Sequence, residues 1–288
     1  MAFAPASLIL ANNFLPFNEA LYAFKIHSVN GVTLIKSLNK IMLLLSMIFL
    51  ASCSLSAQKP NLLLNLEELN FSTTDRKLAT AAGSGNIKSI NVAIKQGANV
   101  NSIGTNGLPI LFWPLRQQNF VGFESLLQKG GNPNYSWETG LSIVELTSGL
   151  KEKEFLKTVL KNNGNPNHIN PVSKKSPLIV ATINDLQENI SLLLDAGANI
   201  DYQDSTGESA LFYAINLGQY DTAIFLLKEG ADPKLKDIWG NTAGHSLNVR
   251  LDTPDIGQNG YESFVSLKEI FGHYLGVMCL FKSVRCLL

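Results

Sequence analysis

The sequence has few of the residues from which catalytic and metal sites are built. Its 288 residues include 3 cysteines and 4 histidines, and 16% of them are charged. The histidines His27, His168, His245 and His273 are scattered, and none has a partner at metal-ligand spacing. A phosphate-binding glycine loop and a nucleophile elbow are also absent from the sequence. We therefore expect no metal, no cofactor and no enzymatic activity.

Neither sign of charge is in excess. The sequence has 23 Lys and Arg residues against 23 Asp and Glu residues. It therefore lacks the basic stripe that usually accompanies binding to nucleic acid, and we expect no nucleic-acid partner. Hydrophobic residues make up 45% of the chain, which is the composition of a globular protein and not of a disordered one.

An apolar run near the N-terminus is too short to cross a bilayer. Residues 41–51 form an apolar run of 11 residues, whereas a membrane-spanning helix needs about 20. Lys36 and Lys40 precede the run, and no acidic residue occurs between Glu19 and Glu67. A basic stretch followed by a short apolar stretch is typical of a secretory signal, which we place at residues 34–52.

The end of this run, Leu50-Ala51-Ser52-Cys53, resembles the lipobox of bacterial lipoproteins. The resemblance implies that Cys53 becomes the first mature residue and carries a lipid, and that Ser54 directs the protein to the outer membrane. The alternative is a signal anchor or a simple export signal with an incidental cysteine. Residues 1–33 show no helical or strand period, and we expect a non-native upstream extension there. The alternative is a second, longer product retained in the cytosol.

Two short patterns repeat in phase along the rest of the chain. One is an ending that occurs as Gly97-Ala98-Asn99, Gly130-Gly131-Asn132, Asn163-Gly164-Asn165, Gly197-Ala198-Asn199 and Gly230-Ala231-Asp232. By subtraction, the first residues of these endings are 33, 33, 34 and 33 apart. The other pattern is a marker at Gly107, Gly140, Lys174, Gly207 and Gly240, with steps of 33, 34, 33 and 33. Such a period predicts a stack of similar units.

Each unit has the pattern of two short amphipathic helices, as residues 205–237 show most clearly. Apolar residues recur there at spacings of three and four in two runs, separated by a turn at Gly218. Ser209 precedes the first run, where its hydroxyl is expected to accept a hydrogen bond from the helix N-terminus. Gly230 follows the second run, where a helix end favours a left-handed residue. Asn163, which replaces glycine in one unit, also tolerates that conformation.

These units resemble the ankyrin repeat, a helix–turn–helix with a hairpin loop and a period of about 33 residues. The family's Thr-Pro-Leu-His-x-Ala run is matched best by Ser176-Pro177-Leu178-Ile179-Val180-Ala181. The resemblance implies an all-α solenoid of five to six repeats over residues 75–247, after a lipid-anchored tether at 53–74. Residues 248–288 are expected to form an insert loop, a capping helix from Tyr261 to about Leu275, and a tail that contains Cys279 and Cys286.

The resemblance also implies that the chain binds another protein with its hairpin tips and the concave face of its inner helices. The candidate contact residues at those positions are Arg116, Gln117, Tyr135, Trp137, Glu138, Tyr202, Ile238 and Trp239. Trp137 and Trp239 fall in predicted hairpins, and tryptophan is enriched among the residues that dominate interfaces. The alternative is that each ring packs on the next hairpin.

Together these patterns predict a lipid-anchored ankyrin-repeat protein that faces the periplasm and binds another protein without catalysis. A more specific hypothesis is an immunity protein that neutralises an exported antibacterial toxin at the envelope. A hypothesis from another class is an envelope enzyme that uses the polar insert at residues 251–260.

Overall fold

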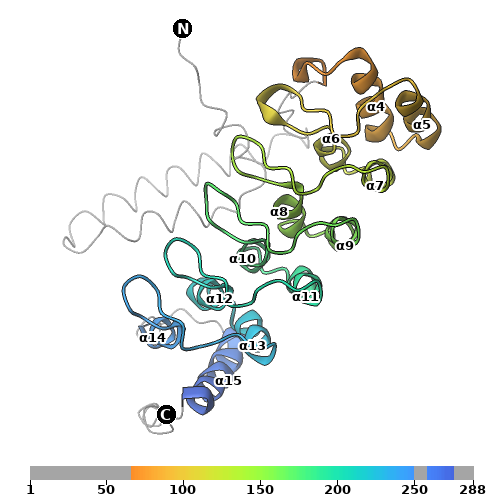
Figure 1. Cartoon of the computed structure of the whole chain (residues 1–288). Helices are drawn as coiled ribbons and strands as arrows, with labels where there is room; N and C mark the ends of the chain where they lie inside the picture. The colour runs from red at the N-terminus through yellow and green to blue at the C-terminus, as the bar shows by residue number, and fades with distance from the viewer. Residues whose placement is uncertain (1–65, 250–257, 276–288) are drawn as a thin grey trace, which may run out of the picture. The chain divides into compact units, whose positions relative to one another are not determined.

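The computed structural model describes residues 66–249 and 258–275 (Figure 1). The predicted signal, the lipidation site at Cys53 and most of the polar insert lie outside these residues. So does the tail with Cys279 and Cys286. The predictions for those segments stay predictions.

The described residues form pairs of helices that stack along one direction, with a loop projecting between successive pairs (Figure 1). The inner helices are α4 (Thr73–Gly83), α6 (Phe112–Arg116), α8 (Ile143–Ser148), α10 (Pro177–Ile183), α12 (Ala210–Leu217) and α14 (Ala243–Val249). The outer helices are α5 (Ile87–Lys95), α7 (Phe120–Gln128), α9 (Lys153–Lys161), α11 (Gln187–Asp195), α13 (Tyr220–Lys228) and α15 (Gln258–Leu275). Two short 3-10 helices, η1 (Leu66–Leu69) and η2 (Thr105–Gly107), complete this part of the chain.

The loops between pairs are tight hairpins, which we number first to fifth. They comprise residues 103–109, 136–142, 170–175, 204–208 and 236–242. The first, second and fifth are closed by isolated β-bridges, and the described part of the chain contains no longer strand. The predicted all-α solenoid is therefore confirmed.

Both repeated patterns mark residues with positive φ. The endings after the outer helices have φ values of 92° at Gly97, 90° at Gly130, 64° at Asn163, 85° at Gly197 and 97° at Gly230. The marker in the hairpins has φ values of 70° at Gly107, 80° at Gly140, 58° at Lys174, 75° at Gly207 and 83° at Gly240. Residues with a side chain rarely adopt this conformation, and eight of these ten positions are glycine. Asn163 and Lys174 occupy the other two.

The core is continuous along the stack because no single pair of short helices can bury its own apolar face. Leu156, Leu193 and Leu226 of three successive outer helices belong to one buried cluster that also contains residues of the inner helices α10 and α12. Charged residues of the 151–161 segment lie on the solvent side of α9, while Phe155 and Leu156 are buried.

Serine caps begin some of the inner helices. The hydroxyls of Ser142 and Ser176 accept hydrogen bonds from the backbone N–H groups of Glu145 and Ile179, at 3.2 and 3.3 Å. Ser209 lies at the corresponding position of α12, but its side chain makes no capping bond. The predicted capping bond of Ser209 is therefore wrong, although the helix begins where the prediction placed it.

The two ends of the array are closed differently. At the start, Leu69 and Phe71 are buried beside η1 and the first hairpin. At the other end, α15 packs on α13 through Phe264, whose ring centroid lies 5.2 Å from that of Tyr220. The predicted capping helix is therefore present, and it begins three residues earlier than Tyr261, at Gln258.

Candidate protein-binding surface

Asparagine and aspartate side chains tie each hairpin base to the next. The side-chain Oδ1 atoms of Asn101, Asn134, Asn167 and Asp201 accept hydrogen bonds from backbone N–H groups of the following unit, at 2.7 to 2.8 Å. The three asparagines also donate from Nδ2 to a carbonyl of the following unit, at 2.8 to 2.9 Å. We call this series the asparagine ladder. It holds the hairpins at a fixed spacing, so their tips form a rigid edge.

The fifth hairpin presents two large apolar side chains to solvent. Ile238 is 63% exposed and Trp239 is 60% exposed. The turn beneath them is fixed by the Asp237 carboxylate, whose Oδ1 accepts hydrogen bonds from the backbone N–H groups of Trp239 and Asn241, at 2.9 and 2.8 Å. The backbone N–H of Ile238 donates to the carbonyl of Thr206 in the fourth hairpin, at 3.0 Å. The exposed pair therefore sits on an ordered turn.

Trp137 lies in the second hairpin and is only 4% exposed. Its ring packs on Phe112 of α6 with the centroids 6.0 Å apart. Counted by the repeat, Trp137 corresponds to Asp237 and not to Trp239, so its side chain is directed into the stack. The prediction that Trp137 is a surface contact residue is therefore wrong. The ring packs inside the array, but on the preceding helix and not on the next hairpin as the alternative had it.

The other predicted contact residues are spread over several units. Gln117 and Glu138 are exposed, whereas Arg116 and Tyr135 are half-buried. Tyr202 is half-buried and donates a hydrogen bond from its hydroxyl to the Lys174 carbonyl at 2.7 Å. Burial, and to a lesser extent the Asp204 carboxylate, raises the pKa of this hydroxyl.

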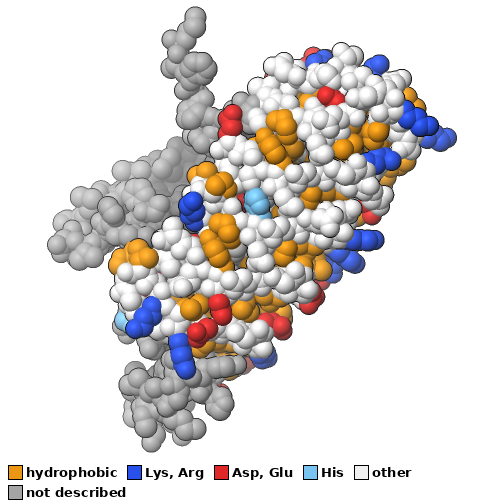
Figure 2. All heavy atoms as spheres, viewed as in Figure 1, with side chains coloured by type: hydrophobic (Ala, Val, Ile, Leu, Met, Phe, Trp, Pro, Cys, Tyr) orange, Lys and Arg blue, Asp and Glu red, His pale blue; other side chains and the backbone are white. Residues whose placement is uncertain are grey.

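The predicted residues therefore do not form one patch. Arg116 and Gln117 belong to the unit of α6, and three further hairpins follow before the fifth (Figure 1). In Figure 2 the hydrophobic side chains on the visible face are scattered rather than joined into one area. A partner that needs an apolar anchor on the hairpin edge thus finds its largest exposed side chain at Trp239.

Two polar contacts within the array were not predicted from the sequence. Glu145 of α8 is buried, and Asn170 in the third hairpin donates from Nδ2 to both of its carboxylate oxygens, at 3.0 and 2.9 Å. Asp204 in the fourth hairpin accepts a hydrogen bond from the Tyr213 hydroxyl of α12 at 2.7 Å. These carboxylates are held by hydrogen bonds inside the array, so they support hairpins and are not positioned as acids or bases.

A serine and a histidine also meet between hairpins. The Ser136 hydroxyl and His168 Nε2 are 2.7 Å apart. Burial lowers the pKa of His168, which keeps the ring neutral near pH 7. In the described part of the chain no carboxylate is hydrogen-bonded to this ring, so the orienting third member of a hydrolytic triad is missing. The contact serves to join the second and third units.

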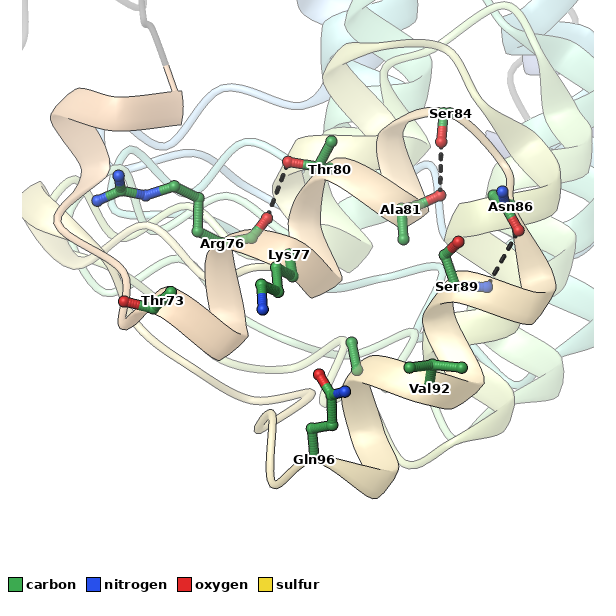
Figure 3. A pocket seen from close by; sticks show the side chains of 11 residues that line it. Thr73, Arg76, Lys77, Thr80, Ala81, Ser84, Asn86, Ser89, Val92 and Gln96 are labelled. Carbon is green, nitrogen blue, oxygen red and sulfur yellow. Dashed lines mark hydrogen bonds between the residues drawn. The ribbon is translucent and has the colours of Figure 1, made fainter.

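A groove of about 620 Å³ opens between α4 and α5 at the start of the array (Figure 3). Two of its hydroxyls are hydrogen-bonded within the first helix: Thr80 Oγ1 donates to the Arg76 carbonyl at 2.9 Å, and Ser84 Oγ donates to the Ala81 carbonyl at 3.0 Å. Lys77 lines the groove, and by the repeat it corresponds to the buried Ile110 and Ile143. A terminal repeat needs a polar outer face because no further repeat covers it. The groove is therefore explained as part of this solvent-exposed face.

The residues that the structure describes carry no metal-binding cluster and no membrane-spanning helix. No group of three His, Cys, Asp or Glu side chains could hold a metal ion there. Within the same ranges, no helix has the length and apolar character needed to cross a membrane.

Comparison with known proteins supports the same fold. A family model described as ankyrin repeats, in three copies, matches residues 146–237. The crystal structure of an ankyrin repeat domain from Acinetobacter baumannii superposes with a TM-score of 0.58 at 23% sequence identity, covering 68% of this chain and 97% of that one. The described part of the chain therefore has the ankyrin-repeat fold.

Two curated relatives are similar over shorter stretches. Protein PhlB of Serratia liquefaciens is 25% identical over 142 residues, which are 49% of this chain and 62% of the relative. The glycerophosphocholine phosphodiesterase gde1 of Schizosaccharomyces pombe is 30% identical over 95 residues, which are 33% of this chain and 8% of the relative. The chain thus spans less than two thirds of the length of each of these two relatives.

Proposed function

We propose that this protein is a non-enzymatic binding array that is held at the bacterial envelope by a lipid on Cys53 and recognises another protein in the periplasm. The observation that carries the binding role is the exposed pair Ile238 and Trp239 on the ordered turn of the fifth hairpin. Ankyrin repeats are typically binding scaffolds, and their short stacked units present such turns along one edge.

Trp239 is the side chain that we expect to contribute most of the binding free energy. A few large, rigid side chains supply most of the free energy of a protein interface, and tryptophan is among the commonest of them. Burying Trp239 in an interface costs little backbone entropy, because a hydrogen bond to the Asp237 carboxylate already fixes the backbone of Trp239. Because Trp239 is 60% exposed and lies outside the buried core, a partner can bury it without disturbing the core.

The binding role is tested by capture of a partner from membranes with a tag at the C-terminus, comparing the parent with Trp239→Ala. We expect the substitution to weaken binding by at least about 1 kcal/mol and to leave the melting temperature unchanged. Val121→Ala is the control, because Val121 is 52% exposed and lies on the outer helix α7, outside the hairpins. Equal binding by Trp239→Ala and the parent would show that the Trp239 side chain does not contribute to the interface.

Trp137→Ala is expected to lower the stability of the array, in contrast to Trp239→Ala. It removes a buried ring that packs on Phe112, so unfolding should become easier by about 3–5 kcal/mol. Loss of binding in this variant would accompany loss of structure. Comparing the two tryptophans therefore separates a contact residue from a core residue.

The envelope setting rests on the sequence before residue 66, and its test is independent of the array. We expect the protein to incorporate a labelled fatty acid and to partition with membranes. Cys53→Ala should abolish the labelling and leave the precursor uncleaved. Equal labelling of the variant would contradict the lipid attachment.

The immunity hypothesis is a special case of the same binding role, in which the partner is a toxin. It requires that cells lacking this protein are poisoned when a sibling toxin is delivered to the periplasm. Survival of such cells, with a verified toxin present, would leave only the general binding role. The enzyme hypothesis requires hydrolytic activity that a point mutation in residues 251–260 abolishes.

A further inference from the structure

A polar side chain at the start of the turn fixes the third, fourth and fifth hairpins. In the fourth hairpin, Asp204 Oδ1 accepts hydrogen bonds from the backbone N–H groups of Thr206 and Glu208, at 2.8 and 3.2 Å. Asp237 does the same in the fifth hairpin, and Asn170 Oδ1 accepts two backbone hydrogen bonds in the third. Each of these turns is thereby tied to a side chain of its own hairpin.

The second hairpin has no side-chain acceptor at this position. Counted by the repeat, Trp137 stands there, and an indole ring donates a hydrogen bond but accepts none. Its ring instead packs on Phe112 of α6, and the buried Nε1 atom has no hydrogen-bond partner among the described residues. Burial of the indole therefore leaves an N–H group unpaired, which opposes the closed conformation of the turn.

The hydroxyl of Thr139 in the same hairpin is also unpaired. Thr139 Oγ1 is buried, and no atom in the described part of the chain is hydrogen-bonded to it. The matching hydroxyl in the fourth hairpin, Thr206 Oγ1, donates to Asp204 Oδ1 at 2.6 Å. The two threonines occupy the same position of the turn. Their hydroxyls differ because the turn starts with Trp137 in one hairpin and with Asp204 in the other.

Packing by the following hairpin does not distinguish the second hairpin from the fourth. A Cβ position on Gly140 lies 3.0 Å from Val172 Cγ2 of the third hairpin, and one on Gly207 lies 2.9 Å from Asp237 Cα of the fifth. Both turns are therefore covered, and they differ in how the turn itself is held.

The base of the second hairpin is held by the asparagine ladder through Asn134. Two backbone hydrogen bonds close the turn above it. Trp137 N–H donates to the Leu141 carbonyl at 3.1 Å, and Gly140 N–H donates to the Trp137 carbonyl at 2.7 Å. Residues 137–141 are therefore the segment that has to move for the turn to open.

We propose that the second hairpin is a conformational device of the array: residues 137–141 open separately from the rest of the stack and bring the Trp137 indole to solvent. Burial of the ring keeps the closed turn the major conformation, and the two unpaired groups lower the free energy needed to open it. In the open turn, water pairs with the indole N–H and with the Thr139 hydroxyl. This opening is a property of the array alone and does not depend on the proposed binding role.

Native-state hydrogen exchange of the full chain, followed by NMR, tests the opening. The Trp137 and Gly140 N–H groups are compared with those of Asp204 and Gly207, which make the same two backbone bonds in the fourth hairpin. We expect protection factors at least about tenfold lower in the second hairpin, because local opening lowers protection only in the segment that opens. The indole N–H of Trp137 should exchange with similarly low protection.

The same substitution at two matched positions should have opposite effects. Thr139→Val removes an unpaired buried hydroxyl at nearly constant shape, so the protection factor of Gly140 N–H should rise at least about fivefold. Thr206→Val removes a hydroxyl that donates to a carboxylate, so the protection factor of Gly207 N–H should fall at least about fivefold.

Three results would overturn the proposal. Equal protection of the matched amides would show that the second and fourth turns are equally stable. An unchanged protection factor of Gly140 in Thr139→Val would show that the unpaired hydroxyl does not favour opening. If the amides of α8 and α10 exchange as fast as those of Trp137 and Gly140, the exchange reports unfolding of the whole array and the second hairpin has no opening of its own.

Discussion

Asn134 and Asn165 join two consecutive units through a side chain and a backbone group. Asn134 Oδ1 accepts a hydrogen bond from the backbone N–H of Asn165 at 2.8 Å, and Asn134 Nδ2 donates to the Asn163 carbonyl at 2.8 Å. One amide thus serves as donor and acceptor for the unit that follows it. The same arrangement recurs at Asn101 and Asn167, which makes the asparagine ladder a property of the repeat.

Asn134→Ala should lower the free energy of unfolding by about 1–3 kcal/mol, because both backbone partners lose their hydrogen bonds at a half-buried site. Urea denaturation followed by far-UV circular dichroism measures the change. Asn91→Ala is the control, since Asn91 is exposed on α5 and takes no part in the ladder. Equal effects of the two substitutions would mean that the ladder does not stabilise the stack.

Gly230→Val should lower the free energy of unfolding by about 1–2 kcal/mol, because a β-branched residue is forced to a φ of 97°. The added Cβ makes no close contact, since a Cβ position on Gly230 has no neighbour within 4 Å. Gly230→Asn should therefore cost clearly less, as Asn163 occupies the same position in another unit with a φ of 64°. If the melting temperature of Gly230→Asn is as low as that of Gly230→Val, the backbone conformation does not determine which residues are tolerated at this position.

Asn170→Asp should destabilise the array in a pH-dependent way. The new carboxylate can still accept the hydrogen bonds that the Val172 and Ser173 N–H groups donate to Asn170 Oδ1. It loses the Nδ2 donor to the buried Glu145 carboxylate and places a second negative charge beside it. We expect a loss of about 2–3 kcal/mol near neutral pH. The loss should shrink as pH falls, because two close carboxylates share a proton and one pKa rises.

Asn165→Asp is the matched control for this effect. Asn165 Oδ1 accepts from the backbone N–H of Asn167 at 2.9 Å, and its side chain donates no hydrogen bond. Aspartate already stands at the corresponding position as Asp232. Denaturation midpoints measured across a pH series should therefore separate the two variants, and parallel curves would contradict the role given to the Glu145 contact.

His168 should make the array less stable in acid. Burial lowers its pKa in the folded protein below the ordinary value of 6.5. The unfolded chain therefore binds a proton at higher pH than the folded chain does, and stability decreases as pH falls below about 6.5. Its contribution is fully present above that pH.

The measurement is the urea midpoint at about pH 5.5 and about pH 7.5 for the parent and for His168→Gln. The difference between the two pH values should be smaller in the variant, which cannot take up a proton. His245→Gln serves as the control because His245 is exposed on α14. An unchanged pH difference in His168→Gln would show that this ring does not contribute.

The sequence alone determined the units and their ends. The endings at Gly97 through Gly230 and the markers at Gly107 through Gly240 were readable because a left-handed turn depends on the residue that occupies it. The helix faces were readable for a similar reason, since spacings of three and four place residues on one side of a helix. The capping helix α15 followed from that pattern, and only its first residue differed from the prediction.

Only the tertiary structure decided which side chains remain accessible. Trp137 and Trp239 both lie in hairpins, yet one is buried against Phe112 and the other is exposed. The two rings differ in exposure because they occupy different positions of the turn: Trp137 corresponds to Asp237, two residues before the position of Trp239, and packs on the preceding helix. The contact between Glu145 and Asn170, which are 25 residues apart, likewise depends on how neighbouring units stack. Local sequence sets the conformation of each turn, whereas exposure is set by the neighbour that packs on it.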